Sequence, residues 1–452
     1  MGWIRDFVER IQRKDMAMDY VQLEKKISAA VEKERGRLLD LCERLMNIES
    51  VTGNEKNVQD EVKSIFEEIG LETDYWIPDD EELKNYSLYA DTGESFCNRP
   101  VVVGILRGKY PPKGKSLLIN GHVDVVTAEP LDMWDTDPFS AAIQDGKLIG
   151  RGASDMKTGL CVGIFCTELL KKYFGGVNND ITIVSVPGEE NGGNGTAASL
   201  MRGYTKADAS VFPEPTSNQI QPAHRGAAFW RIYIDGRSSH GGTKYKGVSA
   251  VEKGIKVVAA LQELEDTRNR EICSKNVFYK DYPLSAPVTV GIFRGGQFTS
   301  GVPEHCMIEG CIELVPGEDV KDVARTLEEA VLGTCKEDPW LTEHPPRVEW
   351  LGLFYNPAQT EPDHPFVSLA RECYQAVTGE EPVVNGFEAG TDMRLLNRNF
   401  GVPGLMFGAG DIAMAHAPNE YVEIDELIKN AKVMALMMAQ WCGIEDVDFQ
   451  NE

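Results

Sequence analysis

The sequence is short of positive charge: its 452 residues include 46 lysines and arginines against 71 aspartates and glutamates, a formal net charge of −25. A surface with this balance repels phosphate backbones and anionic lipid headgroups. The sequence also lacks any run of about 20 apolar residues, the length that a membrane-spanning helix needs. We therefore expect neither a nucleic-acid partner nor a membrane partner.

Signals for export and for disulfide bonding are missing as well. The first residues, MGWIRDFVERIQRKD, contain no continuous apolar segment of the kind that a secretory signal peptide needs. The 10 cysteines are scattered and none forms a Cys-x-x-Cys pair, so they indicate reduced thiols in the protein core. These absences together predict a cytoplasmic protein.

Apolar periodicity divides the chain into three stretches. Up to about residue 222, strands such as RPVVVGILRG and DITIVSVPG alternate with helices such as TGLCVGIFCTELLKKYF, which predicts an α/β sheet covered on both faces. From Ala223 the pattern changes, because RGAAFWRIYIDG alternates at period two as a half-exposed antiparallel strand does. After Pro345 the first pattern returns, and it closes with the helix IDELIKNAKVMALMMAQWCG.

We therefore expect one α/β domain that is interrupted by a smaller α+β domain. The larger domain would comprise residues 1–222, including a helical N-terminal extension, and residues 346–452. The inserted domain would comprise residues 223–345, in the order β-α-β-β-α. One face of its sheet would be open.

Chemically active side chains fall at or just beyond the ends of the predicted elements. Taken one at a time, each has an ordinary explanation: a surface His-x-Asp pair, an Asp that caps a helix, two solvated glutamates, an acidic surface turn and a loop histidine. The residues are His122 and Asp124 in INGHVDVV, Asp155 in GRGASDMKTGL, Glu189 and Glu190 in VSVPGEENGGNG, Glu214 in FPEPT and His416 in AMAHAPNEYV.

Taken together, these positions favour a metal site. In an open α/β sheet, the carboxyl ends of the strands form the binding crevice. Two histidines and three carboxylates suit two zinc ions, with one carboxylate bridging them. Two such ions, about 3.5–4 Å apart, polarise a carbonyl group and lower the pKa of a bridging water.

The sequence resembles the di-zinc amidohydrolases that include acetylornithine deacetylase, succinyl-diaminopimelate desuccinylase, aminoacylase and carboxypeptidase G. The resemblance runs from about residue 35 to residue 443. It implies a mixed-sheet, zinc-peptidase-like catalytic domain with an inserted ferredoxin-like domain that serves as dimerisation and lid domain. The motifs that carry it are GHVDVV, MWDTDPFSAAIQDGKLIGRGASDMKTG, PGEENGGNGT, GRSSHGG, GTDMRLLNRNFGVPGLMFGAG and AHAPNEYV.

The resemblance also implies a ligand set for two zinc ions per subunit. His122 and Glu214 would bind one ion, Glu190 and His416 the other, and Asp155 would bridge both. Cobalt or manganese could serve at a nitrogen–oxygen site of this kind.

Two further residues receive roles from the resemblance. Asp124 would orient His122, and Glu189 would act as the general base on zinc-bound water. Glu189 would then pass the proton to the leaving amine. Because successive residues near a strand end face different ways, Glu190 can bind metal while Glu189 faces the water.

Three residues bear on the substrate and on assembly. By resemblance, His240 in GRSSHGGT would reach the active site of a second subunit and stabilise the oxyanion, which implies a homodimer built through the inserted domain. Arg394 in EAGTDMRLLN matches the arginine with which aminoacylases bind the substrate's α-carboxylate. Arg225 in AHRGAAF is a weaker candidate of the desuccinylase type. A surface histidine and a structural salt bridge remain the alternatives for His240 and Arg394.

Two departures argue against a strict desuccinylase. Where some relatives carry Asn before Val-Pro, this chain has Ser300 and Gly301, and where desuccinylases carry an Arg, it has Leu314. We therefore predict a metal-dependent deacylase, similar to acetylornithine deacetylase, for a small N-acyl amino acid or related compound. A dipeptidase or carboxypeptidase on the same scaffold is the alternative, and a metal-free, ligand-binding paralogue is the alternative outside the enzymes.

Overall fold

The computed structural model describes residues 20–273 and 275–444. Most of the predicted N-terminal extension lies outside the described residues, but residues 20–33 are helical. The larger domain is built around a nine-stranded mixed sheet, which confirms the predicted α/β class. Its strands, in order across the sheet, are β1 (Glu72–Trp76), β2 (Val101–Leu106), β6 (Ile181–Val186), β3 (Leu117–His122), β7 (Ala209–Phe212), β17 (Gly404–Met406), β8 (Ile220–His224) and β15 (Ala358–Gln359), with β16 (Val384–Phe387) also paired to β8.

The centre of this sheet is parallel and buried. Strand β3 pairs with β6 and β7 in parallel, and every residue of β3 is buried, as expected for a strand covered on both faces. Antiparallel strands β1 and β2 complete one side. The carboxyl ends of β3, β6 and β7 therefore meet at one edge of the sheet.

Helices cover both faces of the nine-stranded sheet. One apolar core lies under the set that includes α5, and a second lies under the set that includes α6. The first set is α2 (Arg35–Met46), α3 (Lys56–Glu68), α5 (Lys157–Phe174), α10 (Pro365–Thr378) and α12 (Ile424–Cys442), and the second is α4 (Asp80–Lys84), α6 (Asn194–Met201) and α11 (Met393–Phe400).

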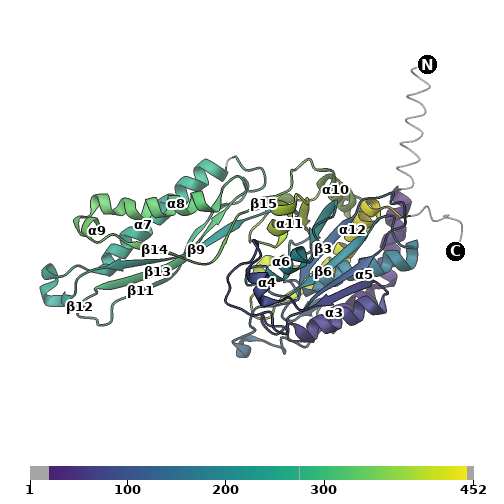
Figure 1. Cartoon of the computed structure of the whole chain (residues 1–452), viewed down its shortest axis with the longest axis horizontal. Helices are drawn as coiled ribbons and strands as arrows, with labels where there is room; N and C mark the ends of the chain where they lie inside the picture. The colour runs from purple at the N-terminus through teal and green to yellow at the C-terminus, as the bar shows by residue number, and fades with distance from the viewer. Residues whose placement is uncertain (1–19, 274, 445–452) are drawn as a thin grey trace, which may run out of the picture.

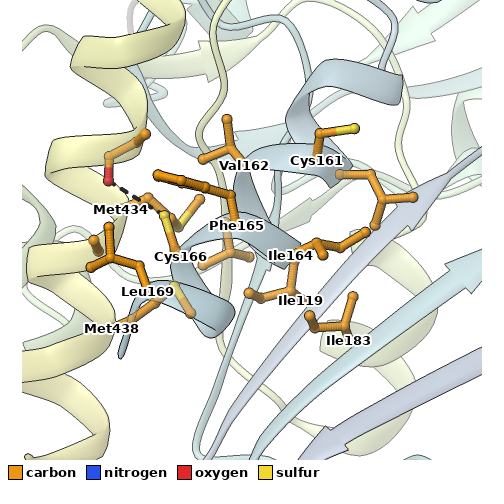
Figure 2. Close-up of a cluster of buried hydrophobic side chains, with 14 of the residues drawn as sticks. Ile119, Cys161, Val162, Ile164, Phe165, Cys166, Leu169, Ile183, Met434 and Met438 are labelled. Atoms are coloured by element: carbon orange, nitrogen blue, oxygen red, sulfur yellow. Dashed lines mark hydrogen bonds between the residues drawn. The ribbon is translucent and has the colours of Figure 1, made fainter. Parts of the chain in front are cut away.

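Helix α5 is the central helix of the first core. Figure 2 shows Ile119 of β3 on one side of it and Met434 of α12 on the other. The thiol of Cys166 donates a hydrogen bond to the Ala431 carbonyl of α12, at 3.4 Å. The helix ends at Phe174 because Gly175 adopts the left-handed conformation, with φ of 66°.

The inserted domain projects away from the larger domain (Figure 1). Its antiparallel sheet has the order β11 (Val288–Gly295), β13 (His305–Leu314), β9 (Gly226–Asp235) and β14 (Arg347–Tyr355). Helices α7 (Ala250–Arg268) and α8 (Val320–Gly333) pack on one face of this sheet around a separate apolar core. Burial alternates along β9, as the period-two pattern predicted.

Strand β14 changes the expected boundaries of this domain. It pairs with β9, although its residues follow the predicted boundary at residue 345. At the other end, β8 belongs to the large sheet up to His224, and β9 begins at Gly226. We therefore propose that the insertion runs from Gly226 to Tyr355.

Smaller elements connect these layers. Among them are β10 (Ser239–His240) paired with β12 (Gly301–Val302), the three-stranded sheet of β18 (Tyr421–Glu423), β5 (Lys147–Ile149) and β4 (Ala142–Gln144), the short helix α9 (Pro339–Glu343), and the further short helices η1 (Leu131–Met133), η2 (Gly241–Lys246), η3 (Asn269–Cys273), η4 (Thr334–Glu337) and η5 (Ile412–Met414). Within the described residues, none of the helices is both long enough and apolar enough to cross a membrane.

Candidate metal centre and active site

The predicted ligands gather at the edge where the parallel strands end. His122 is the last residue of β3, and Glu214 follows the end of β7 by two residues. Glu190 lies in the turn between β6 and α6, and Asp155 lies in the turn that leads into α5. The fifth residue, His416, comes from the loop before β18. The topology thus brings together residues that are almost 300 positions apart in the sequence.

Asp155 lies between the two histidines. Its Oδ1 is 3.0 Å from His122 Nε2, and its Oδ2 is 3.5 Å from His416 Nε2. The two oxygens of one carboxylate thus face different imidazole rings. This arrangement is compatible with a carboxylate that is shared by two metal ions.

Each histidine has a glutamate beside it. Glu214 Oε2 lies 4.0 Å from His122 Nε2, and Glu190 Oε2 lies 3.0 Å from His416 Nε2. Within the described residues, the tightest cluster of possible ligand atoms is that of His122, Asp155 and Glu190, whose ligand atoms all lie within 4.8 Å of one another. The division into two half-sites, each with one imidazole, one glutamate and one oxygen of Asp155, stays a prediction.

His122 is held by the main chain of Asp124. The ring donates from Nδ1 to the Asp124 carbonyl oxygen at 2.8 Å, which leaves Nε2 free to face Asp155. The Asp124 carboxylate, expected to orient this ring, lies 3.7 Å from Nδ1. It accepts the backbone N–H groups of Glu189 and Glu190 instead, each at 3.2 Å. Asp124 therefore fixes both the imidazole and the turn that carries the two glutamates.

Glu420 is a supporting residue to which the sequence analysis assigned no role. It is fully buried, and its Oε1 accepts the N–H groups of Ser154 at 2.8 Å and Asp155 at 3.0 Å. Its Oε2 pairs with Arg151 Nη1 at 2.7 Å. The signal for it was its place in the motif AHAPNEYV, four residues after His416. Glu420 thereby connects the turn of Asp155 to the loop of His416. His416 itself has a positive φ of 62°, a conformation that the surrounding structure has to hold.

The site contains several buried carboxylates, which cations would stabilise in their charged form. Burial and neighbouring carboxylates raise the pKa of Glu189 well above its usual range and raise the pKa of Glu214 to about 8. Hydrogen bonding to Asp155 and Glu190 raises the pKa of His416 to about 10. Without metal, the site would therefore take up protons at neutral pH. Two imidazoles and three carboxylates suit divalent ions such as Zn²⁺, so the residues fit the predicted metal site.

A cavity of about 170 Å³ opens beside these residues. It is lined by side chains of the site and by an apolar wall that comes partly from the inserted domain. The lining residues are Asp155, Glu189, Glu190, Gly192, Glu214, Leu353, Tyr355, Phe387, Ala389, Gly390, Arg394, Ile412 and His416. Glu189 therefore faces the same space as the metal ligands, as a general base must.

Arg394 reaches the cavity and is held there by polar contacts. Its guanidinium donates to the carbonyl oxygens of Thr391 at 2.7 Å and Gly192 at 2.8 Å. Asp392 Oδ1 lies 3.4 Å from Nη1, and the guanidinium lies over the Tyr355 ring at 4.5 Å. Arg394 thus has both the place expected of a substrate-binding residue and the acidic neighbour of a structural salt bridge.

The structure does not bring Arg225 to the cavity. Its guanidinium is buried and pairs with Glu313 Oε2 at 2.8 Å, with further donation to the carbonyl oxygens of Glu388 and Leu284. His240 lies exposed on β10, where its Nδ1 accepts the N–H of Gly242 at 3.1 Å. Neither residue lines the cavity of its own chain. For His240, a role in the site of a second subunit stays a prediction.

The fold and this donor set are those of a metal-dependent hydrolase. The model of peptidase family M20/M25/M40 matches residues 118–440, and the chain belongs to this family. The predicted resemblance is thereby confirmed. The chain is an amidohydrolase-type enzyme of a metal-dependent family.

The relatives of this chain carry the names of different hydrolases. The protein named N-formyl-4-amino-5-aminomethyl-2-methylpyrimidine deformylase of Halalkalibacterium halodurans is 28% identical over 436 residues, 92% of this chain and 97% of the relative. A probable succinyl-diaminopimelate desuccinylase of Staphylococcus epidermidis is 27% identical over 329 residues, 68% of this chain and 79% of the relative. The solved structure of an M20 metallo-carboxypeptidase from Sulfolobus solfataricus has a TM-score of 0.68 at 19% identity, and the match covers 90% of this chain and 99% of that one. The last comparison shows the fold.

Proposed function

We propose that this enzyme is a deacylase that hydrolyses the amide bond of a small N-acylated amine, with Glu189 as the general base. The observation that carries the proposal is that Glu189, four of the five predicted metal ligands and Arg394 all line one small cavity; the four ligands are Asp155, Glu190, Glu214 and His416. Base, metal ligands and a candidate anchor for the substrate are therefore within reach of one bound molecule.

The residues divide the chemistry between them. His122, Glu214, Asp155, Glu190 and His416 would hold two divalent ions, which supply polarisation of the scissile carbonyl and a lowered pKa of the attacking water. Glu189 takes a proton from that water while the water oxygen bonds to the carbonyl carbon of the substrate. The same carboxyl group then delivers the proton to the amide nitrogen as the C–N bond breaks, which yields a carboxylic acid and an amine.

We consider two substrate classes for this cavity. An N-acyl amino acid would place its carboxylate on Arg394, as a guanidinium binds a carboxylate through paired hydrogen bonds. An N-formylated heteroaromatic amine is favoured by the 28% identity to the named deformylase and by the aromatic rings of Tyr355 and Phe387 in the cavity wall. A substrate of the second class carries no carboxylate, so it needs no cationic side chain to bind it. This agrees with Arg394, whose guanidinium already donates to two carbonyl oxygens of the protein. A dipeptidase or carboxypeptidase would use the same base and ligands.

Hydrolysis of a substrate panel tests this proposal. The panel contains N-acetyl amino acids, dipeptides and N-formyl-4-amino-5-aminomethyl-2-methylpyrimidine, each assayed as purified, after chelation and after zinc is restored. We expect one class to be cut, chelation to stop the reaction and zinc to restore it. Glu189→Gln should lower kcat by about 10²-fold or more, because a positioned general base contributes about 10²–10⁴-fold.

Two outcomes would count against the proposal. Zinc-loaded protein that cuts no member of the panel would contradict the substrate classes. A Glu189→Gln variant with unchanged kcat would contradict the assignment of the base. Arg394→Gln separates the two classes, since it should raise KM for an N-acyl amino acid and leave KM for the formylated pyrimidine largely unchanged.

A further inference from the structure

Strand β14 of the inserted domain carries an irregularity next to the active site. Its pairing with β9 is regular from Arg347 to Leu351 and resumes at Phe354, so Gly352 and Leu353 have no partner on β9. Gly352 has a positive φ of 43°. Bulges of this kind bend a strand and redirect its side chains, and they are frequent beside active sites.

The bulge places two side chains of β14 against catalytic-domain turns. Leu353 packs over Gly192 in the turn that follows Glu189 and Glu190. A Cβ atom at Gly192 would lie 2.9 Å from Leu353 Cδ2. Tyr355 packs against Gly390 so closely that a Cβ atom there would overlap the ring. Both turns therefore have a glycine at the point of contact with β14, where a larger residue would collide with Leu353 or Tyr355.

Leu353 and Tyr355 also line the cavity, together with residues of the catalytic domain. Phe387 and Ile412 contribute the other apolar surface, and Arg394 lies over the Tyr355 ring. The cavity of about 170 Å³ is smaller than the 300–1,000 Å³ of pockets for drug-sized ligands. The bulge is thus an apolar wall that closes a small space beside the general base.

We propose that Leu353 is a specificity-determining residue, which limits the substrate group beside the scissile amide to a short aliphatic chain or a single flat ring. This inference rests on the proposed function, since it concerns the same cavity. Its physical basis is steric: a larger group would have to displace the Leu353 side chain, which extends from the β14 bulge onto the turn of Gly192. Shortening Leu353 cuts back this wall and replaces neither a metal ligand, nor the base, nor Arg394.

The test compares Leu353→Ala and Leu353→Trp with the wild type and with Leu351→Ala. Leu351 is a matched control, because it is the same residue type on the same strand, lies before the bulge and does not line the cavity. Two substrate series are used: one enlarges the acyl group from formyl to benzoyl at constant amine, and the other enlarges the amine at constant acyl group. We expect Leu353→Ala to raise kcat/KM for the larger members of one series by about tenfold relative to its smallest member. Leu353→Trp should lower kcat/KM for the larger members of that series relative to its smallest member.

A binding measurement makes the result independent of turnover. Calorimetry on the zinc-loaded variants uses acetohydroxamate and its analogues enlarged by a phenyl group on carbon or on nitrogen. If the wild type cuts nothing, the proposed function fails, and a selective gain of Leu353→Ala for a phenyl analogue would still support the wall. Size profiles of Leu353→Ala that match those of the wild type, or an equal change in Leu351→Ala, would overturn the inference.

Discussion

Asp155 and Asp124 each contact two groups that the chain brings together from distant positions. Asp155 faces one histidine with each oxygen, and Asp124 uses its carbonyl group for His122 and its carboxylate for the Glu189–Glu190 turn. The sequence predicted which residues gather, because each follows a strand or precedes a helix. It did not predict the role of the Asp124 carboxylate, since the turn it holds lies 65 residues away.

Glu420 was missed for a related reason. Its partners are backbone N–H groups about 265 residues earlier in the chain, and a backbone group has no signature in a sequence. Arg225 became a candidate through the resemblance to desuccinylases. The folded chain places Glu313 beside its buried guanidinium, and a sequence does not reveal such a partner 88 residues away.

His224 gives a prediction at the residue scale. It is fully buried at the end of β8, and burial lowers its pKa to about 3, from 6.5. Between pH 3 and pH 6.5 the unfolded chain therefore binds a proton that the folded chain does not, and stability falls as pH drops below 6.5. At pH 5 this costs about 2 kcal/mol.

His224→Gln should remove that part of the acid sensitivity. Urea unfolding at pH 8 and pH 5, on chelated protein, gives the change in unfolding free energy for each form. The loss between the two pH values should be about 2 kcal/mol smaller in the variant. An equal loss in both proteins would show that His224 is not the residue concerned.

At the scale of elements, alternating strands and helices were predictable and β14 was not. Strands such as β3 and β6 are continuous apolar runs bounded by glycine and proline, and their neighbours are close in the sequence. In β14, the bulge at Gly352 and Leu353 breaks the period-two pattern, and its partner β9 lies more than 100 residues earlier. Because of this pairing over a long sequence distance, we propose Tyr355 in place of residue 345 as the end of the inserted domain.

The start of helix α5 gives a prediction at this scale. Gly159 packs against the main chain at the end of β7, where an added Cβ atom would overlap the carbonyl oxygen of Pro213. Gly159→Ala should therefore lower the unfolding free energy by about 1–3 kcal/mol. It should also weaken metal binding, because Pro213 precedes the ligand Glu214.

Gly36→Ala is the matched control. Gly36 is the second residue of helix α2, and an added Cβ atom there would have no neighbour within 4 Å, so the same substitution should raise stability by up to about 1 kcal/mol. Thermal unfolding and zinc titration of both variants provide the comparison. If both substitutions change stability and zinc affinity in the same way, Gly159 is not required for the close packing of α5 against the end of β7.

At the scale of the whole molecule, the inserted domain contributes to the cavity of its own chain through β14. We propose that it also contributes His240 to the site of a second subunit. The exposure of His240 and the unpaired outer edges of β11 and β14 within the four-stranded sheet support this proposal. The sequence resemblance suggested the homodimer, and a single chain carries no information on which edge pairs.

Mixing two inactive variants tests the shared site. Glu189→Gln lacks the base and His240→Ala lacks the partner's contribution, so each homodimer should be nearly inactive. After the mixture is unfolded and refolded, half of the sites in a heterodimer contain both wild-type residues, and activity should recover to about a quarter of the wild-type value. No recovery, from protein shown to refold as a dimer, would place His240 outside the active site.

The central claim is that Asp155 joins two metal half-sites, one with His122 and Glu214 and one with His416 and Glu190. Zinc content per chain, measured by mass spectrometry after loading and desalting, tests it most directly. The wild type and Glu189→Gln should retain about two zinc ions per chain, and Asp155→Asn should retain fewer than one. A wild type that holds a single ion, or an Asp155→Asn variant that still holds two, would contradict the shared-carboxylate site.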